Sequence, residues 1–223
     1  MSSRLRVFDS SVGTKILIGL TGLALALYLV VHIAGNLIVF LGPEIFNEYS
    51  HTLLSNPLIP IIEIVLLAIF LVHIYKTVRM YLANRQARPI AYAQKRNAGK
   101  PSRKTFASTT MIFTGLWLLI FVIIHVMTFK YGPEYDAGDG VRDLYRLEME
   151  NFSNPLVVAF YVVSMIVVGS HLWHGASSAF QSLGIDNPRW TPRLLTAGKA
   201  FAVLIAGGFI VIALWAHFAG ARS

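Results

Sequence analysis

Ser170-His171-Leu172-Trp173-His174-Gly175 is the centre of the stretch that decides the fold, which runs from residue 155 to residue 184. The stretch begins with a nearly unbroken apolar run, Leu156 to Gly169, and with its continuation it is long enough to cross a bilayer as a helix. Two histidines follow within the same apolar segment. Because an imidazole in hydrocarbon is costly, such a ring is expected to face the interior of a helix bundle and to have a function there.

Apolar stretches of similar length recur along the whole chain. Of its 223 residues, 55% are apolar and only 13% are charged. Segments of about 20 residues or more can span a membrane, and five are found, at about 14–41, 58–82, 106–129, 156–180 and 194–218. Since open sheet edges cannot lie in lipid, we predict one all-α membrane domain over residues 1–223, a bundle of five transmembrane helices. The first run is too long for a signal peptide and is interpreted as the first span.

Two features of the composition exclude whole classes of function. Cysteine is absent, so the chain has no disulfide, no thiolate metal site and no iron–sulfur cluster of its own. No dinucleotide-binding fingerprint is present either. Chemistry that needs a bound nucleotide or an iron–sulfur centre must therefore come from another protein.

The net charge of +8 is unevenly distributed between the linkers. The segment from Arg79 to Lys104 contains eight Lys and Arg and no acid, whereas residues 130–154 contain six acids and three basic residues. Such alternation is typical of membrane topology rather than of nucleic-acid binding, and we expect no nucleic-acid partner. Positive-inside counting places the N-terminus and the second and fourth linkers in the cytoplasm, with the C-terminus outside. The basic linker could also dock an acidic partner subunit.

Both outer linkers contain a predicted surface helix. Residues 42–57 are expected to form a short amphipathic helix on the membrane surface, and residues 141–149 a second one. The apolar side of the first would comprise Ile45, Phe46, Tyr49 and Leu53.

Four of the predicted spans each contain a histidine, and these histidines fall into two pairs by depth. At a rise of about 1.5 Å per residue, His32 lies ~27 Å and His125 ~28 Å from the cytoplasmic ends of their spans. His73 lies ~14 Å and His171 ~12–14 Å from theirs. The two levels are therefore ~13–16 Å apart along the membrane normal. We predict an inner pair, His73 with His171, and an outer pair, His32 with His125.

Two imidazoles at each of two levels favour the axial ligation of a b-type haem iron. Zinc or copper would require three or four convergent ligands, and a proton relay would require carboxylates at matching depth, where Glu63 is the sole acid within the spans. A lone buried histidine is more often a packing or hydrogen-bonding residue, so the hypothesis depends on the pairing. Two haems would form a two-stop electron path from a docked partner to a mobile lipid-soluble carrier.

The histidine motifs resemble a known family. His32-x-x-Gly35-Asn36, His73, His125 and especially His171-Leu-Trp-His174-Gly175-Ala-Ser-Ser-Ala-Phe180-Gln181-Ser-Leu-Gly184 are similar to the dihaem cytochrome b subunit (cytochrome b558 type) of succinate dehydrogenase and fumarate reductase. The resemblance covers nearly the whole chain, and its most specific part is the fourth span.

The resemblance implies cofactors, partners and site residues. It implies two haem b with four axial ligands at His32, His73, His125 and His171, and a membrane quinone, menaquinone or ubiquinone. It implies docking to a flavoprotein subunit and an iron–sulfur subunit on the cytoplasmic side of a bacterial plasma membrane, among membrane lipids, with a higher oligomer of the complex as a further expectation. It implies no catalytic residue for succinate in this chain.

Three polar residues of the spans have open interpretations. His174 shares a helix face with His171; it could contact a haem propionate or a partner subunit, or it could simply pack. Glu63 lies near the outer level and could exchange protons with a quinone, or it could be a helix-start carboxylate favoured by the helix dipole. His217 has no partner in this scheme.

Two alternative functions remain open at this point. The chain could be the cytochrome b subunit of another respiratory enzyme, of the formate dehydrogenase or hydrogenase type. It could also be a proton-coupled transporter that uses its membrane histidines, in which case the purified protein would be colourless.

Overall fold

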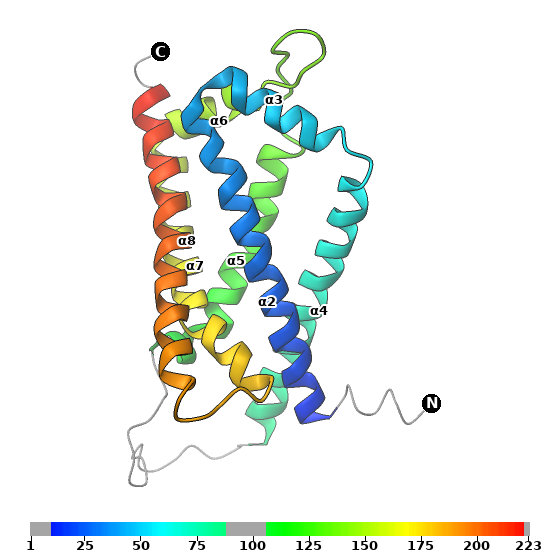
Figure 1. The fold of residues 1–223 in the computed structure, drawn as a ribbon, viewed down its shortest axis with the longest axis vertical. Helices are drawn as coiled ribbons and strands as arrows, with labels where there is room; N and C mark the ends of the chain where they lie inside the picture. The colour runs from blue at the N-terminus through cyan, green and yellow to red at the C-terminus, as the bar shows by residue number, and fades with distance from the viewer. Residues whose placement is uncertain (1–9, 88–105, 221–223) are drawn as a thin grey trace.

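The architecture is an all-α bundle whose long helices run roughly parallel to one axis (Figure 1). A computed structural model of the chain describes residues 10–87 and 106–220. Its elements are α2 (Ser11–Asn36), the 3₁₀ helix η1 (Leu37–Leu41), α3 (Pro43–Leu54), α4 (Ile59–Gln86), α5 (Phe106–Phe129), α6 (Leu144–Ser153), α7 (Pro155–Ser182) and α8 (Thr191–Gly220).

Five of the described helices are long and apolar enough to cross a membrane: α2 with η1, α4, α5, α7 and α8. The predicted class, a multi-pass membrane bundle of five helices, is confirmed, and the predicted ends of the spans differ from the observed ones by at most about four residues. Most of the basic linker, residues 88–105, lies outside the described residues.

Local capping groups explain where α7 begins and ends. The Asn154 side chain accepts a hydrogen bond from the Leu156 N–H at 2.9 Å, and Pro155 occupies the first turn, where its missing N–H does no harm. At the other end Gly184 has a φ of +88°, and the Ile185 N–H donates to the Phe180 carbonyl at 3.0 Å. This left-handed glycine cap ends α7 at Ser182.

The core lies mainly between α7, α8 and the half of α5 that contains Phe121. Its buried residues are Phe121, Phe152, Val158, Tyr161, Met165, Val168, Leu172, Ala202, Ile205, Ala213 and Ala216. Small residues let the helices approach closely, since a Cβ added at Gly169 would lie 3.1 Å from the Ala206 side chain. In membranes such small-residue contacts allow helices to pack by van der Waals attraction without a hydrophobic driving force.

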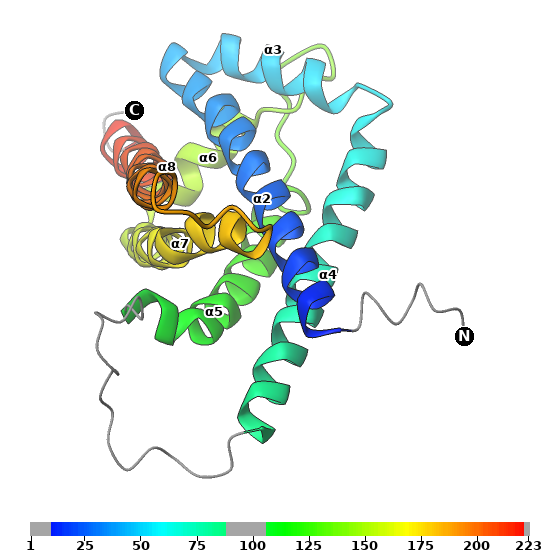
Figure 2. The ribbon, with the colours of Figure 1, turned by 60° about the horizontal axis from the view of Figure 1, so that its bottom comes forward.

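In contrast, α4 is attached mainly to α2. None of the residues of α4 is buried, and large apolar side chains around it are more than half exposed, among them Ile61, Ile64 and Leu71. Figure 2 shows α4 on the side of α2 opposite α8. The position of His73 on α4 is therefore set chiefly by α2.

One end of the bundle is covered by α3 and α6, and we call it the capped end (Figure 1). The Asn47 side chain joins the two helices: its amide donates to Asp143 at 2.8 Å and accepts from the Tyr145 N–H at 3.0 Å. On the predicted apolar side of α3, Phe46 is buried, whereas Ile45 and Leu53 are exposed, as side chains that meet lipid would be. Hydrogen bonding to α6 keeps the polar side chain of Asn47 buried.

The second surface helix starts later than predicted, at Leu144 instead of residue 141. Residues 138–140 have positive φ angles of 109°, 54° and 75°, a conformation that no α-helix accepts. After this turn Asp143 caps the helix by accepting a hydrogen bond from the Arg146 N–H at 2.9 Å. The cap, rather than the apolar pattern, decides where α6 begins.

Replacing Gly19 with valine is expected to lower the stability of the bundle by about 1–3 kcal/mol, because overpacking a close helix contact forces the backbones apart. A Cβ at Gly19 would lie 3.1 Å from the Ala179 carbonyl oxygen of α7. Gly207→Val is the matched control, since a Cβ there meets nothing within 4 Å. Thermal unfolding of the purified proteins in detergent measures the effect, and equal midpoints for the two variants would contradict the prediction.

Candidate functional site

Two of the four histidines meet in the half of the bundle toward the capped end. The rings of His32 on α2 and His125 on α5 have their centroids 5.8 Å apart, with their planes at 85°. Aromatic rings surround the pair: Tyr28 stacks on His32 at 5.3 Å, and Phe121 stacks on His125 at 5.6 Å. The structure thus brings together the two histidines that depth assigned to the outer level.

The Nδ1 atom of each outer histidine contacts a neighbouring polar side chain. Nδ1 of His32 lies 3.4 Å from the Asn36 side-chain nitrogen, and Nδ1 of His125 lies 3.3 Å from the Tyr161 hydroxyl. Tyr161 belongs to α7, and Phe209 of α8 lies 5.5 Å from the His32 ring. The outer pair is therefore packed by side chains of α7 and α8 as well as by those of its own helices.

The two inner histidines share one contact, a threonine hydroxyl at Nδ1, and His73 also bonds to the Ile18 backbone. Nδ1 of His73 on α4 lies 3.0 Å from Oγ1 of Thr21 on α2. Nδ1 of His171 on α7 lies 3.0 Å from Oγ1 of Thr114 on α5. Each histidine is therefore anchored across a helix–helix contact by a threonine hydroxyl.

A glycine follows each of these threonines. A Cβ added at Gly22 would lie 3.3 Å from Cε1 of His73, and one added at Gly115 would lie 3.6 Å from Cε1 of His171. The glycines allow the imidazoles to come close to the backbones of the neighbouring helices. The repeated Thr-Gly dipeptide is a signal in the sequence that could have located the Thr21 contact, which the sequence reasoning missed.

The inner histidines are less directly joined than the outer ones. Among the described residues no ring contact links His73 to His171, but the two lie within electrostatic range of one another. The structure therefore places both on the half of the bundle away from the capped end without bringing their rings into contact.

His174 lies within electrostatic range of His171, and it also lines the contact between α7 and α8. It is half-buried and lines a small cavity of about 60 Å³ between α7 and α8, together with Gln181 and Lys199. The Lys199 ammonium lies 5.5 Å from the centre of the Trp173 ring. An open, mostly apolar hollow of about 340 Å³ lies on the other side of Trp173. His174 thus faces α8, and its contact with a propionate stays a prediction.

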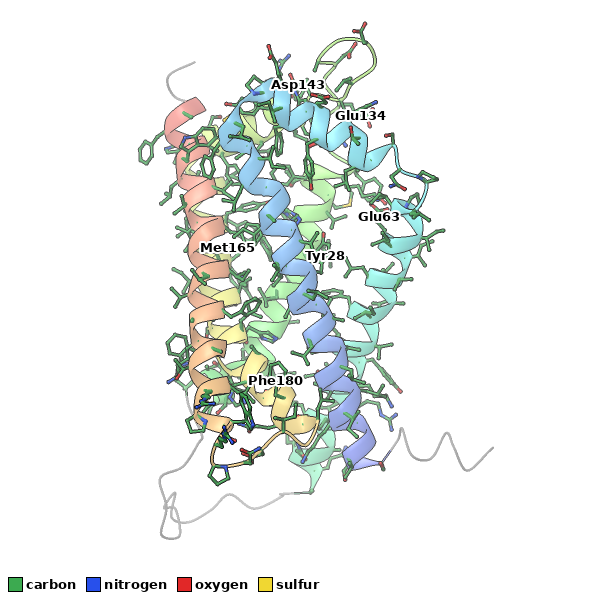
Figure 3. The ribbon with its side chains drawn as sticks, in the orientation of Figure 1. Tyr28, Glu63, Glu134, Asp143, Met165 and Phe180 are labelled. Carbon is green, nitrogen blue, oxygen red and sulfur yellow. The ribbon has the colours of Figure 1, made fainter. Side chains whose placement is uncertain are left out.

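Glu63 lies in the half of the bundle toward the capped end, as does Tyr28 (Figure 3). Its carboxylate forms an ion pair with Lys130, at the end of α5, and acts electrostatically on Tyr28, whose ring stacks on His32. Both members of the ion pair are about two-fifths exposed. Glu63 is therefore placed beside the outer site, and the ion pair ties α4 to α5.

His217, which had no role by sequence, is a structural residue. Its Nδ1–H donates a hydrogen bond to the Phe152 carbonyl at 2.8 Å, which attaches α8 to the end of α6. The ring therefore satisfies a backbone carbonyl near the capped end and is not directed at the outer pair.

The capped end contains a buried acid that the sequence did not single out. Glu148 on α6 is only 5% exposed, although it belongs to an acidic linker. Removal of the carboxylate from water raises the pKa of Glu148 to about 8. Its charge would lie close enough to Tyr161 to act on that hydroxyl, which in turn contacts His125.

The intramembrane histidines offer imidazole pairs and not a closed metal site. The part of the chain that the structure describes has no group of three or more His, Cys, Asp or Glu able to hold a metal ion. Two metal–nitrogen bonds of about 2 Å plus the two ring radii require imidazole centroids roughly 6 Å apart. The outer pair, at 5.8 Å, meets that requirement.

A neighbouring side chain contacts Nδ1 in all four rings, but the contacts differ in direction. The hydroxyls at His73, His171 and His125 can accept a proton from Nδ1, whereas the Asn36 amide nitrogen at His32 only donates, so Nδ1 of His32 is the acceptor there. Comparison of the chain with protein-family models, with curated proteins and with solved structures found no match. The assignment of a function therefore depends on the residues and their geometry.

Proposed function

We propose that this chain is the membrane-anchor cytochrome b subunit of a succinate:quinone oxidoreductase, which carries two b haems and passes electrons between an iron–sulfur subunit and a membrane quinone. The observation that carries the proposal is the meeting of His32 and His125, whose ring centroids lie 5.8 Å apart although they belong to different helices. Threonine hydroxyls at Nδ1 of His73 and His171 support it at the inner level.

Bound haem would supply one-electron transfer at each level, with its potential set by the axial ligands and their hydrogen bonds. The residues of the chain would hold and orient it. His32 and His125 would ligate at the outer level, and His73 and His171 at the inner level. The aromatic rings of Tyr28 and Phe121 would exclude water from the outer site.

The partners in this proposal follow from topology. The flavoprotein and iron–sulfur subunits would dock at the end away from α3 and α6, where the basic residues of the second linker gather in the sequence. That end would face the cytoplasm of a bacterial cell, with the capped end outside the plasma membrane. Glu63, beside Tyr28 at the outer level, is the residue of this chain proposed to contact quinone.

Purification of the full chain from a host that makes haem is expected to give a coloured protein with two haems per chain. The reduced-minus-oxidised spectrum should show the bands of a bis-histidine b haem, because two pairs of imidazoles are available. Haem extraction measures the ratio of haem to protein. A colourless, folded protein would overturn the proposal in favour of a transporter.

The proteins that co-purify with the chain separate the proposal from its nearest alternative. A flavoprotein with succinate dehydrogenase or fumarate reductase activity supports the proposed enzyme. A formate dehydrogenase or hydrogenase partner would leave the proposal of two haems in place but would assign the chain to a different respiratory enzyme.

A further inference from the structure

We infer that Thr21 and Thr114 are positioning residues, whose hydroxyls fix the tautomer of His73 and His171 and so strengthen Nε2 as the ligand of the inner haem. The inference rests on the proposed function and goes beyond it. It assigns to the inner site a control of ligand strength by two side chains that do not touch the metal.

The geometry is the same on two separate pairs of helices. On α2 and α4 the distance from Thr21 Oγ1 to His73 Nδ1 is 3.0 Å, and on α5 and α7 the distance from Thr114 Oγ1 to His171 Nδ1 is also 3.0 Å. The partners are 52 and 57 residues apart in the chain, so neither contact follows from local helix geometry. Both inner histidines thus contact a threonine hydroxyl at the same distance, which indicates that the two threonines have the same role.

The direction of the hydrogen bonds follows from the proton count of the hydroxyl. A threonine hydroxyl has one proton to donate and lone pairs with which to accept. Thr21 lies 2.6 Å from the Leu17 carbonyl, and Thr114 lies 3.0 Å from the Met111 carbonyl, so each hydroxyl donates its proton to its own helix. The remaining contact must then run from Nδ1–H of the imidazole to Oγ1. This direction fixes the tautomer with its proton on Nδ1 and its lone pair on Nε2.

A histidine that donates Nδ1–H to an acceptor becomes a more basic ligand at its other nitrogen, and loss of such a partner lowers metal affinity by about 10–100-fold. A more basic axial ligand stabilises the oxidised iron and lowers its reduction potential. The two threonines would thus both orient the rings and hold the inner potential down.

The same helix offers a threonine that lacks this contact. Within residues 10–87 and 106–220, the hydroxyl of Thr110, one turn before Thr114, bonds to the carbonyls of Phe106 and Ala107 alone, at 3.0 Å and 3.4 Å. Bonding back to the preceding turn is the ordinary behaviour of a threonine within a helix. Thr110 is therefore a matched control for every effect of removing a hydroxyl from α5.

The test compares Thr114→Val, Thr114→Ser and Thr110→Val in the His125→Ala background, where only the inner haem is expected to remain. Valine keeps the shape of threonine and removes the acceptor, whereas serine keeps the hydroxyl. Thr114→Val should raise the midpoint potential of the inner haem and speed its loss to a haem scavenger at least tenfold. Thr114→Ser and Thr110→Val should keep the parent values. An unchanged potential in Thr114→Val, or an equal shift in Thr110→Val, would overturn the inference.

A second measurement does not need haem. In the haem-free full chain, ¹⁵N NMR of selectively labelled histidine should show the His171 signal, identified by its loss in His171→Ala, as the Nδ1–H tautomer. Thr114→Val should convert it to a mixture of tautomers. If the tautomer stays unchanged, the inference fails while the haem proposal stands. If the parent protein binds no haem but the tautomer responds as expected, the proposed function fails and only the tautomer control by Thr114 survives.

Discussion

Replacing His171 with alanine is expected to remove one of the two haems per chain and leave the other. Each proposed iron has one imidazole from each of two helices, so alanine at 171 leaves the inner site with a single protein ligand, His73. His73→Ala should remove the same haem, whereas His32→Ala or His125→Ala should remove the other. Haem content by extraction, together with the spectrum of the remaining haem, measures the outcome.

His174→Ala is the matched control for this experiment. It removes an imidazole three residues away on the same helix, but one that lines the small cavity against α8. We expect both haems to stay. Two haems in His171→Ala, or the loss of one in His174→Ala, would show that the ligand of the fourth span is misassigned.

Replacing Glu148 with glutamine is expected to stabilise the protein by roughly 3 kcal/mol at pH 7, since each pKa unit corresponds to about 1.4 kcal/mol. The pKa of Glu148 rises from 4.5 in an unfolded chain to about 8 in the fold. Between these values the unfolded chain releases a proton that the folded chain retains, so stability falls as the pH rises from about 4.5 to about 8. Glutamine has the same shape and no proton to release, which removes this slope.

Unfolding in detergent, measured as a function of pH, tests the prediction. The advantage of Glu148→Gln should vanish near pH 4.5 and be largest above pH 8. Glu150→Gln is the control on the same helix: its exposed carboxylate accepts hydrogen bonds from Tyr135 at 2.6 Å and Arg146 at 2.8 Å, which lower its pKa. Glu150→Gln should therefore not stabilise the protein at any pH. Parallel pH profiles for wild type and Glu148→Gln would contradict the burial argument.

The spans were predictable because a bilayer sets a simple requirement of length and polarity. Segments such as 156–180 and 106–129 contain enough consecutive apolar residues to cross the hydrocarbon. Lipid offers no hydrogen bonds, so the backbone of such a segment must form a helix that pairs its own N–H and C=O groups. The surface helices were less predictable. Their ends depend on single polar contacts, such as the Asp143 cap, which outweighs the apolar pattern.

The amino-acid sequence by itself determined the number of spans and their approximate limits, and from these it predicted a depth for each histidine, because the rise of a helix and the thickness of a bilayer are fixed. The tertiary structure alone decided that His32 and His125 meet ring to ring and that Thr21 and Thr114 hold the inner imidazoles. It also decided that Glu148 is buried. These features depend on the rotation of each helix about its axis. The rotation of a helix depends on where small residues let it approach its neighbours closely. This depends on both helices of a pair, so it cannot be predicted from the sequence of one span.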